Sequence, residues 1–347
     1  MTSFDKIYGG LVGAAIGDCM GAATEMRPTS LIIQRFGGLV EDFVENPDDT
    51  FLRGKPSGYA TDDFSLAYFI AKAIVEDKGL ITNKTAEKAL LAWSDTDWYE
   101  YAGNTTRAAV NTIKGIENPP NRFSFLVCEN SKATNGSAMK IGPIGLASKG
   151  DVNKAIMDSI TINMPTHDNN ISLSGGAAVA AAVAKALHDN ATVNDLVEAG
   201  LFGAKLGYEK GNQIGKILAG PSVEKRIYLA AEIGAKANGD VYKAMYEIAD
   251  IIGSGLACAE AVPAAFGLMV AANGDPIKSI LGGVNIGDDT DTVATIVGAM
   301  VGTLNGYKAY PQRWIDLIEK ENKFNLENLA KDIDSLWEVK LWKKDIW

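Results

Sequence analysis

Gly287-Asp288-Asp289-Thr290-Asp291-Thr292 runs directly into the apolar stretch Val293-Ala294-Thr295-Ile296-Val297-Gly298-Ala299-Met300. Apolar residues at 293, 296, 297, 300, 301 and 304 follow the i, i+3, i+4, i+7 spacing of a buried helix face, which predicts a core helix over 290–305. One aspartate at the start of this helix would cap its free N–H groups and meet a favourable dipole. Three carboxylates crowded there repel one another, and a bound cation would relieve that repulsion.

A second acidic cluster, Thr61-Asp62-Asp63, precedes a helix predicted over 64–76, whose apolar stripe lies at 66, 67, 70, 71 and 74. Each cluster alone is equally well explained as a helix N-cap with additional charge. Two such clusters on strongly apolar helices favour a shared metal site. Hard divalent ions take oxygen ligands, and a few carboxylates commonly hold magnesium while waters complete an octahedron.

Three other metal motifs do not fit these residues. An EF-hand loop counted from Asp289 requires glycine at its sixth position and glutamate at its twelfth, where the chain has Ala294 and Met300. An Asp-Asp-x-x-Asp motif is interrupted by Leu66 in one cluster and by Thr292 in the other. Two histidines and no paired cysteines make zinc a poor candidate.

Helical patterns recur along the chain with almost no period-two alternation, so the sequence predicts an all-α fold. The Gly- and Ala-rich stretch 7–24 fits a buried helix that other helices approach closely. No long linker or repeat divides the chain, so residues 1–347 are expected to form a single domain. The irregular stretches of this domain, at 37–60, 117–137 and 162–170, are expected to contain the residues that carry out chemistry. Further helices are predicted over 83–93, 105–116, 151–161, 171–188, 193–207, 223–236, 239–252, 258–272, 275–282 and 310–319.

Composition narrows the classes of partner. A formal net charge of −10 argues against a large nucleic-acid surface, which requires a basic stripe. Asp18 interrupts the apolar stretch 7–24, which argues against a membrane span. Cys19, Cys128 and Cys258 are few and widely spaced, as expected in a reducing compartment, so a cytoplasmic location is expected.

Three further segments could contribute to a site. Asp18 and Glu25 are seven residues apart, near one helix face if the helix extends that far, although packing explains the glycines around them equally well. The segment 135–143 is predicted to be a turn that runs into a short helix. This turn could cradle a phosphate with Lys140 adding charge, or it could be a plain loop. A lone histidine such as His167 is more often structural than catalytic.

In this order, these segments resemble the ADP-ribosylglycohydrolase family, which includes the dinitrogenase-reductase-activating glycohydrolases. The likeness spans nearly the whole chain; each segment is weak alone, but the ordered set is highly specific. The matching segments are Gly17-Asp18, Gly21, Glu25, Thr61-Asp62-Asp63, Asn135-Gly136-Ser137-Ala138-Met139, Thr166-His167, Ala259-Glu260-Ala261-Val262-Pro263-Ala264-Ala265 and Asn285-Ile286-Gly287-Asp288-Asp289-Thr290-Asp291-Thr292.

The resemblance implies an orthogonal all-α fold with two magnesium ions in a cleft, with manganese as the alternative ion. It implies Glu25 as general base beside the metals, with a metal-bound aspartate, Asp62 or Asp63, as the competing choice. The implied metal ligands are Thr61, Asp62, Asp63, Asp289, Asp291 and Thr292. The implied substrate-binding residues are Thr134, Asn135, Gly136, Ser137 and Lys140, at a diphosphate or distal ribose, and His167 in the ribose pocket.

Three departures from the family pattern bear on the substrate. Phe64 stands where relatives often have a hydroxyl, Asp288 where a glycine is usual, and Lys140 where arginine is common. Phe64 is expected to place a bulky apolar group at the edge of the metal site, and Asp288 is expected to add charge. Lys140 is expected to replace a planar donor fork with a point charge.

The expected function is a magnesium-dependent hydrolase that cleaves ADP-ribose from a modified protein side chain or from a small ADP-ribosyl or ribosyl compound. Neither nucleic acid nor a membrane is an expected partner. An N-ribosyl hydrolase of nucleoside-like molecules and a non-catalytic, crystallin-like relative are the alternatives.

Overall fold

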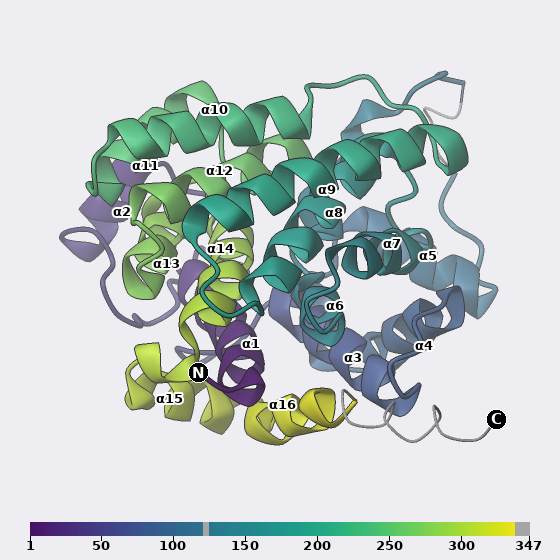
Figure 1. Cartoon of the computed structure of the whole chain (residues 1–347), viewed down its shortest axis with the longest axis horizontal. Coiled ribbons are helices and arrows are strands. Elements are labelled where there is room, and N and C mark those ends of the chain that lie inside the picture. Colours follow the sequence, from purple (N-terminus) through teal and green to yellow (C-terminus); the bar gives the residue numbers. More distant parts are fainter. Residues whose placement is uncertain (121–124, 337–347) are drawn as a thin grey trace.

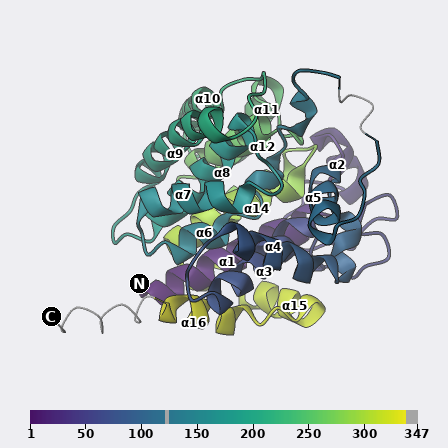
Figure 2. The same cartoon turned by 90° about the vertical axis from the view of Figure 1, so that its right-hand side faces the viewer.

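The computed structural model describes residues 1–120 and 125–336, and within these ranges the chain forms sixteen α-helices and no β-strand (Figures 1 and 2). The all-α prediction is therefore confirmed. None of the helices in these ranges is both long and apolar enough to cross a bilayer. The helices are α1 (Ser3–Gly21), α2 (Thr29–Phe36), α3 (Asp62–Glu76), α4 (Asn83–Ser94), α5 (Asn104–Lys114), α6 (Gly142–Ala147), α7 (Val152–Asn163), α8 (Asn170–Ala186), α9 (Val193–Ile214), α10 (Val223–Lys236), α11 (Val241–Ile251), α12 (Cys258–Ala271), α13 (Pro276–Asn285), α14 (Thr290–Asn305), α15 (Gln312–Asn322) and α16 (Leu326–Ser335).

Helices α1 and α14 pack against each other in the middle of the molecule, and the other helices surround them (Figures 1 and 2). Glycines recur every four residues along the contact face of α1, at 9, 13, 17 and 21, and meet backbone of α14 at 302, 298, 294 and 291 in that order. The two helices are therefore antiparallel. A Cβ on Gly21 would lie 2.5 Å from the Cα of Asp291, so no larger residue fits there. This contact brings the C-terminal end of α1 beside the acidic start of α14.

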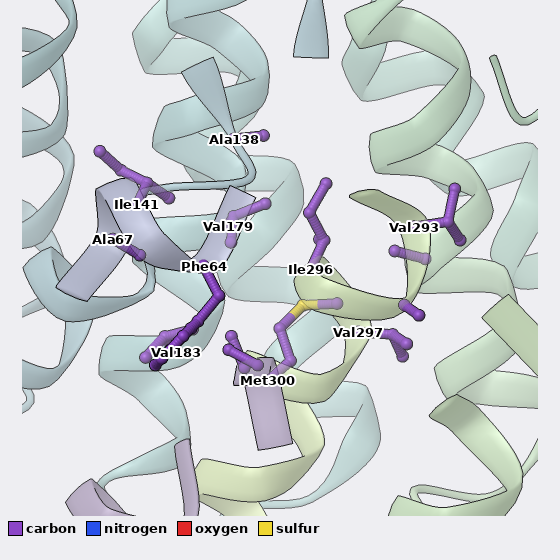
Figure 3. Packing of buried hydrophobic residues seen from close by; sticks show 14 of the residues in the cluster. Phe64, Ala67, Ala138, Ile141, Val179, Val183, Val293, Ile296, Val297 and Met300 are labelled. Atoms are coloured by element: carbon purple, nitrogen blue, oxygen red, sulfur yellow. The ribbon is translucent and has the colours of Figure 1, made fainter. Parts of the chain in front are cut away.

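The opposite face of α14 contributes to the hydrophobic core. Val293, Ile296, Val297 and Met300 are fully buried there, in one cluster with side chains from α3, α6 and α8 (Figure 3). Phe64 belongs to the same cluster, and its ring packs edge-to-face on Phe324 at 5.3 Å.

The expectation that Phe64 borders the metal site is therefore wrong. Successive residues of an α-helix point about 100° apart, so Phe64 faces the core although its neighbour Asp63 faces the cavity.

Most predicted helices are present, with shifted ends. Helix α3 begins at Asp62, which places both of its acidic residues inside the first turn, and α9 continues to Ile214. Helices α2 and α16 were not predicted. Helix α2 has eight residues and buries only Thr29 and Ile32, too few for a periodic pattern, whereas α16 has helical spacing at 326, 329, 330 and 333 that could have been recognised.

Candidate active site

A cavity of about 520 Å³ opens where the N-terminal ends of α3 and α14 meet, within the range usual for small-molecule sites. Its walls combine the residues predicted to hold metal with most of those predicted to bind substrate. The former are Thr61, Asp62, Asp63, Asp289, Asp291 and Thr292, and the latter are Thr134, Asn135, Gly136 and His167. Glu25, the predicted base, also lines the cavity.

The two acidic clusters are in direct contact, although they are far apart in the sequence. The Thr292 hydroxyl donates to Oδ2 of Asp63 at 2.6 Å, which links the first turn of α14 to that of α3. Asp289 occupies the N-cap position of α14 but its carboxylate makes no capping hydrogen bond. Instead, Oδ2 of Asp289 accepts a hydrogen bond from Nδ2 of Asn135 at 2.7 Å. The Asp289 carboxylate therefore faces the site and does not serve its own helix.

Glu25 is held beside Asp289 by backbone pairing. The Met26 N–H donates to the Asp288 carbonyl at 2.7 Å, and the Asp288 N–H donates to the Arg27 carbonyl at 3.0 Å. Nη1 of Arg27 donates to the Glu25 carbonyl at 3.0 Å, which braces the same turn from its other side. As a result, one carboxylate oxygen from each of Glu25, Asp289 and Asp291 lies within 4.8 Å of the others, so these groups could hold a metal ion.

Asp18 supports the site from behind. Its carboxylate is fully buried and accepts hydrogen bonds from the Thr61 N–H at 3.1 Å, the Thr61 hydroxyl at 2.6 Å and the Phe64 N–H at 3.0 Å. Asp18 on α1 therefore caps the first turn of α3. The Gly17-Asp18 pair marks Asp18 in the sequence, but nothing in that pattern predicts its function as a cap.

Burial and mutual repulsion make these carboxylates unfavourable as free anions. Burial, followed by the charge of Asp18, raises the pKa of Asp62 to about 7. Burial followed by neighbouring acidic groups raises the pKa values of Glu25, Asp63 and Asp291 well above their usual range. Burial also raises the pKa of Asp18 to about 6.

None of the ion pairs between described residues includes one of the site carboxylates. Carboxylate oxygens that are clustered, partly desolvated and not paired with a basic side chain match the coordination preference of a hard divalent cation. The residues present therefore fit the metal that the sequence predicts.

The turn at Asn135–Ser137 forms another wall. It is tied to the segment before α12, because the Asn135 N–H donates to the Leu256 carbonyl at 2.9 Å and the Cys258 N–H donates to the Ala133 carbonyl at 2.9 Å. Ser137, which is fully buried, does not line the cavity.

Lys140 also lies behind this wall. It is 1% exposed, and its Nζ donates to the carbonyl of Gly136, four residues earlier. The expectation that Lys140 offers charge to a ligand phosphate is wrong for this structure, because the chain folds the ammonium group back under the turn.

Asp288 lies outside the cavity as well. Its backbone has a φ of +60°, in the left-handed region that favours glycine, and its side chain is exposed. Glycine suits this position because of its backbone conformation. The expectation that the Asp288 charge influences substrate choice therefore finds no support in its position.

Several cavity residues were not predicted. They come from loops, short 3₁₀ segments and the first turn of α5, where single polar or aromatic residues give no periodic signal. Phe51 and Leu256 are 57% and 64% exposed. The others of this kind include Tyr101, Gly103, Asn104, Thr105, Thr106, Glu129, Ser131 and Lys132.

Comparison with known proteins agrees with the residue pattern. The model of the family described as ADP-ribosylglycohydrolase matches residues 1–344. The chain is 29% identical over 318 residues to the uncharacterized protein YegU of Escherichia coli strain K12, covering 88% of this chain and 89% of that protein. It is 25% identical over 336 residues to ADP-ribosylhydrolase ARH3 of Mus musculus, covering 90% of this chain and 87% of that protein.

Another similar protein is ADP-ribosylarginine hydrolase Tri1 of Serratia proteamaculans strain 568, at 24% identity over 343 residues, covering 95% of this chain and 79% of that protein. A solved structure titled "ADP-ribosylglycohydrolase-related protein complex" superposes with a TM-score of 0.67 at 20% identity, covering 96% of this chain and 98% of that one. At this identity the structural likeness speaks for the fold alone.

Proposed function

Because this chain belongs to the ADP-ribosylglycohydrolase family, we propose that it is a magnesium-dependent enzyme that cleaves the glycosidic bond between ADP-ribose and a protein side chain. The family and the relatives named as hydrolases make the chain a glycosidase-type hydrolase. The names of the ARH3 and Tri1 relatives support ADP-ribose as the group removed, and Tri1 supports arginine as one acceptor to test.

The observation that carries the proposal is the convergence of five carboxylates on one cavity, linked across the chain by the Thr292–Asp63 hydrogen bond. Glu25, Asp62, Asp63, Asp289 and Asp291 supply those carboxylates. Two magnesium ions held by the four aspartates, with Thr61 and Thr292, would supply positive charge to ribose hydroxyls and to a water molecule. Manganese is the alternative ion.

The residues of the chain would divide the remaining work. Hydrolysis forms a bond between a water oxygen and the anomeric carbon while the bond to the acceptor breaks, and the acceptor leaves with a proton. Glu25 would take the proton that the water loses. Its position, facing the cavity from a braced turn beside Asp289, supports this role. Asp62 or Asp63 is the competing base. Thr134, Asn135, Gly136 and His167 would position the ribose and the diphosphate.

The test is a substrate panel of ADP-ribosyl-arginine, ADP-ribosyl-serine and simple ribosides, assayed with magnesium, manganese or EDTA. We expect release of ADP-ribose only when a divalent ion is present. Cleavage of ribosides alone would favour an N-ribosyl hydrolase, and undiminished turnover in EDTA would refute the metal requirement.

Glu25→Gln tests the base. We expect kcat to fall by about 10²- to 10⁴-fold, the usual contribution of general base catalysis, while magnesium affinity measured by calorimetry remains largely intact. Glu45→Gln, at an exposed position outside the cavity, is the matched control. An unchanged rate in Glu25→Gln would assign the base to another group.

Two broader expectations remain proposals. The family match over residues 1–344 supports a single catalytic domain. The three cysteines form no disulfide, with Cys19 and Cys258 buried, which supports a reducing compartment such as the cytoplasm.

A further inference from the structure

A chain of polar side chains, three of them buried, lies behind the turn at Asn135–Ser137. It consists of Lys140, Thr166, His167 and Thr134, of which only His167 and Thr134 line the cavity. Lys140, Thr166 and His167 are 1%, 7% and 2% exposed, so the hydrogen bonds among these three are shielded from water. Thr134 is half-buried, at the wall of the cavity. In such surroundings the direction of each hydrogen bond is determined by the donors and acceptors available.

Two groups that can donate a hydrogen bond lie close to Nδ1 of His167. The Thr166 hydroxyl lies 2.8 Å from Nδ1, and Nζ of Lys140 lies 3.4 Å from it. The other acceptor within reach of the Thr166 hydroxyl is the Asn163 carbonyl, at 3.4 Å, which already accepts the His167 N–H at 2.7 Å. Nδ1 is therefore the acceptor, and a neutral ring with Nδ1 as acceptor carries its proton on Nε2.

The ring is neutral and fixed in place. Burial, followed by the positive charge of Lys140, lowers the pKa of His167 well below its ordinary value. A Cβ on Gly136 would lie 2.8 Å from Nε2, so the ring is seated directly against the turn. Nε2 lies 3.0 Å from the Thr134 hydroxyl oxygen, which receives the Nε2 proton. The hydrogen of the Thr134 hydroxyl is then left for a ligand in the cavity.

We propose that Lys140 is a positioning residue that, together with Thr166, holds His167 in its Nε2–H form and thereby orients the Thr134 hydroxyl as a donor to the ligand. The ligand group that this donor fits is an oxygen that bears no hydrogen, such as a phosphate oxygen. The identity of the ligand rests on the proposed function, whereas the tautomer rests on the contacts alone.

The tautomer is measured directly by long-range ¹H–¹⁵N correlation spectra of the full chain labelled with ¹⁵N-histidine. The chain contains two histidines, and His188→Gln assigns the signals because His188 is exposed and distant in the fold. We expect His167 to show a protonated Nε2 and an unprotonated Nδ1 throughout the range from pH 6 to pH 8. A proton on Nδ1, or an imidazolium ring, would overturn the proposal whatever the substrate proves to be.

The effect on the ligand is measured by calorimetric titration with ADP-ribose. Thr134→Val should weaken binding about tenfold, the size of one hydrogen bond to a charged group, and Thr134→Ser should restore it. Lys140→Met combined with Thr166→Val should cause a similar loss, and adding Thr134→Val to that pair should cause no further loss, because all three residues act through one donor.

Thr161→Val, which removes a hydroxyl bonded only to the Met157 carbonyl, is the control. Wild-type affinity in Thr134→Val, or multiplied losses in the triple variant, would overturn the relay. If the buried Lys140→Met change prevents folding, Thr166→Val alone is compared with Thr134→Val. If the wild-type chain binds no ADP-ribose, the proposed function fails, and the histidine spectrum alone decides on the tautomer.

Discussion

The acidic site should make the metal-free protein less stable as the pH rises. Asp62 has a pKa of about 7 in the folded chain, against an ordinary value of 3.8 that applies once the chain unfolds. Between about pH 4 and pH 7 the folded state therefore binds more protons than the unfolded state, and the unfolding free energy falls as the pH increases. The gap between 3.8 and about 7 corresponds to about 4 kcal/mol for this group.

The assay is urea unfolding at pH 5, 6, 7 and 8, in EDTA and in saturating magnesium. In EDTA we expect Asp62 to cost about 3 kcal/mol of unfolding free energy between pH 5 and pH 8, because about one pH unit of the gap lies below pH 5. The loss is smaller if neighbouring carboxylates share one proton. Magnesium should restore about 3 kcal/mol at pH 8, at 100 times its Kd, and much less at pH 5, where protons compete for the same oxygens.

Substitution separates this effect from general acid sensitivity. Asp62→Asn should reduce the pH dependence in EDTA, whereas Asp48→Asn, at an exposed position, should leave it unchanged. A flat or rising unfolding free energy in EDTA would refute the reasoning, as would a magnesium effect of equal size at pH 5 and pH 8.

Three other substitutions test how the fold holds the site. Asp18→Asn should cost about 1–3 kcal/mol of unfolding free energy and lower kcat/KM, because the new amide N–H would face groups that donate hydrogen bonds to Asp18. The control Asp240→Asn, at an exposed N-cap, should be nearly neutral. Gly13→Ala should lower the unfolding free energy measured in urea by about 1–3 kcal/mol or more, because its Cβ would meet the Gly298 carbonyl. Gly38→Ala is the control, because a Cβ there meets open space. Equal effects of the two substitutions would contradict the packing of α1 on α14. The Asp288→Gly protein should be about 1 kcal/mol more stable than the Asp288→Ala protein, because the backbone at this position has a positive φ. Its kcat/KM should stay within about twofold of wild type. A large change in substrate preference would mean that Asp288 reaches the ligand.

The helical architecture and the acidic clusters were readable from the sequence because both depend on local patterns. The stripe of α14 and the paired carboxylates at 62 and 63 are visible within single helices, and a helix mouth rich in acidic residues suggests a cation whatever the rest of the fold. The side-chain directions were not readable in the same way. Phe64 and Lys140 both belong to segments next to the cavity, yet one faces the core and the other lies beneath a turn.

The contrast between Asp18 and Asp289 shows why a role cannot be read from residue type and helix position alone. Asp289 sits at the N-cap of α14, where capping was the simplest prediction, but its carboxylate faces the cavity and accepts from Asn135. Asp18 lies near the C-terminal end of α1, an unfavourable place for an acid in its own helix, and caps α3 instead.

Each carboxylate therefore serves an element remote in sequence, and the close glycine contact between α1 and α14 makes both arrangements attainable. The same contact between α1 and α14 explains how acidic segments from opposite ends of the chain can share one cavity. Residues near the two ends of the sequence meet at one site only if α1 and α14 are antiparallel and in register. A change in that register should separate the carboxylates of the candidate site before it unfolds the core.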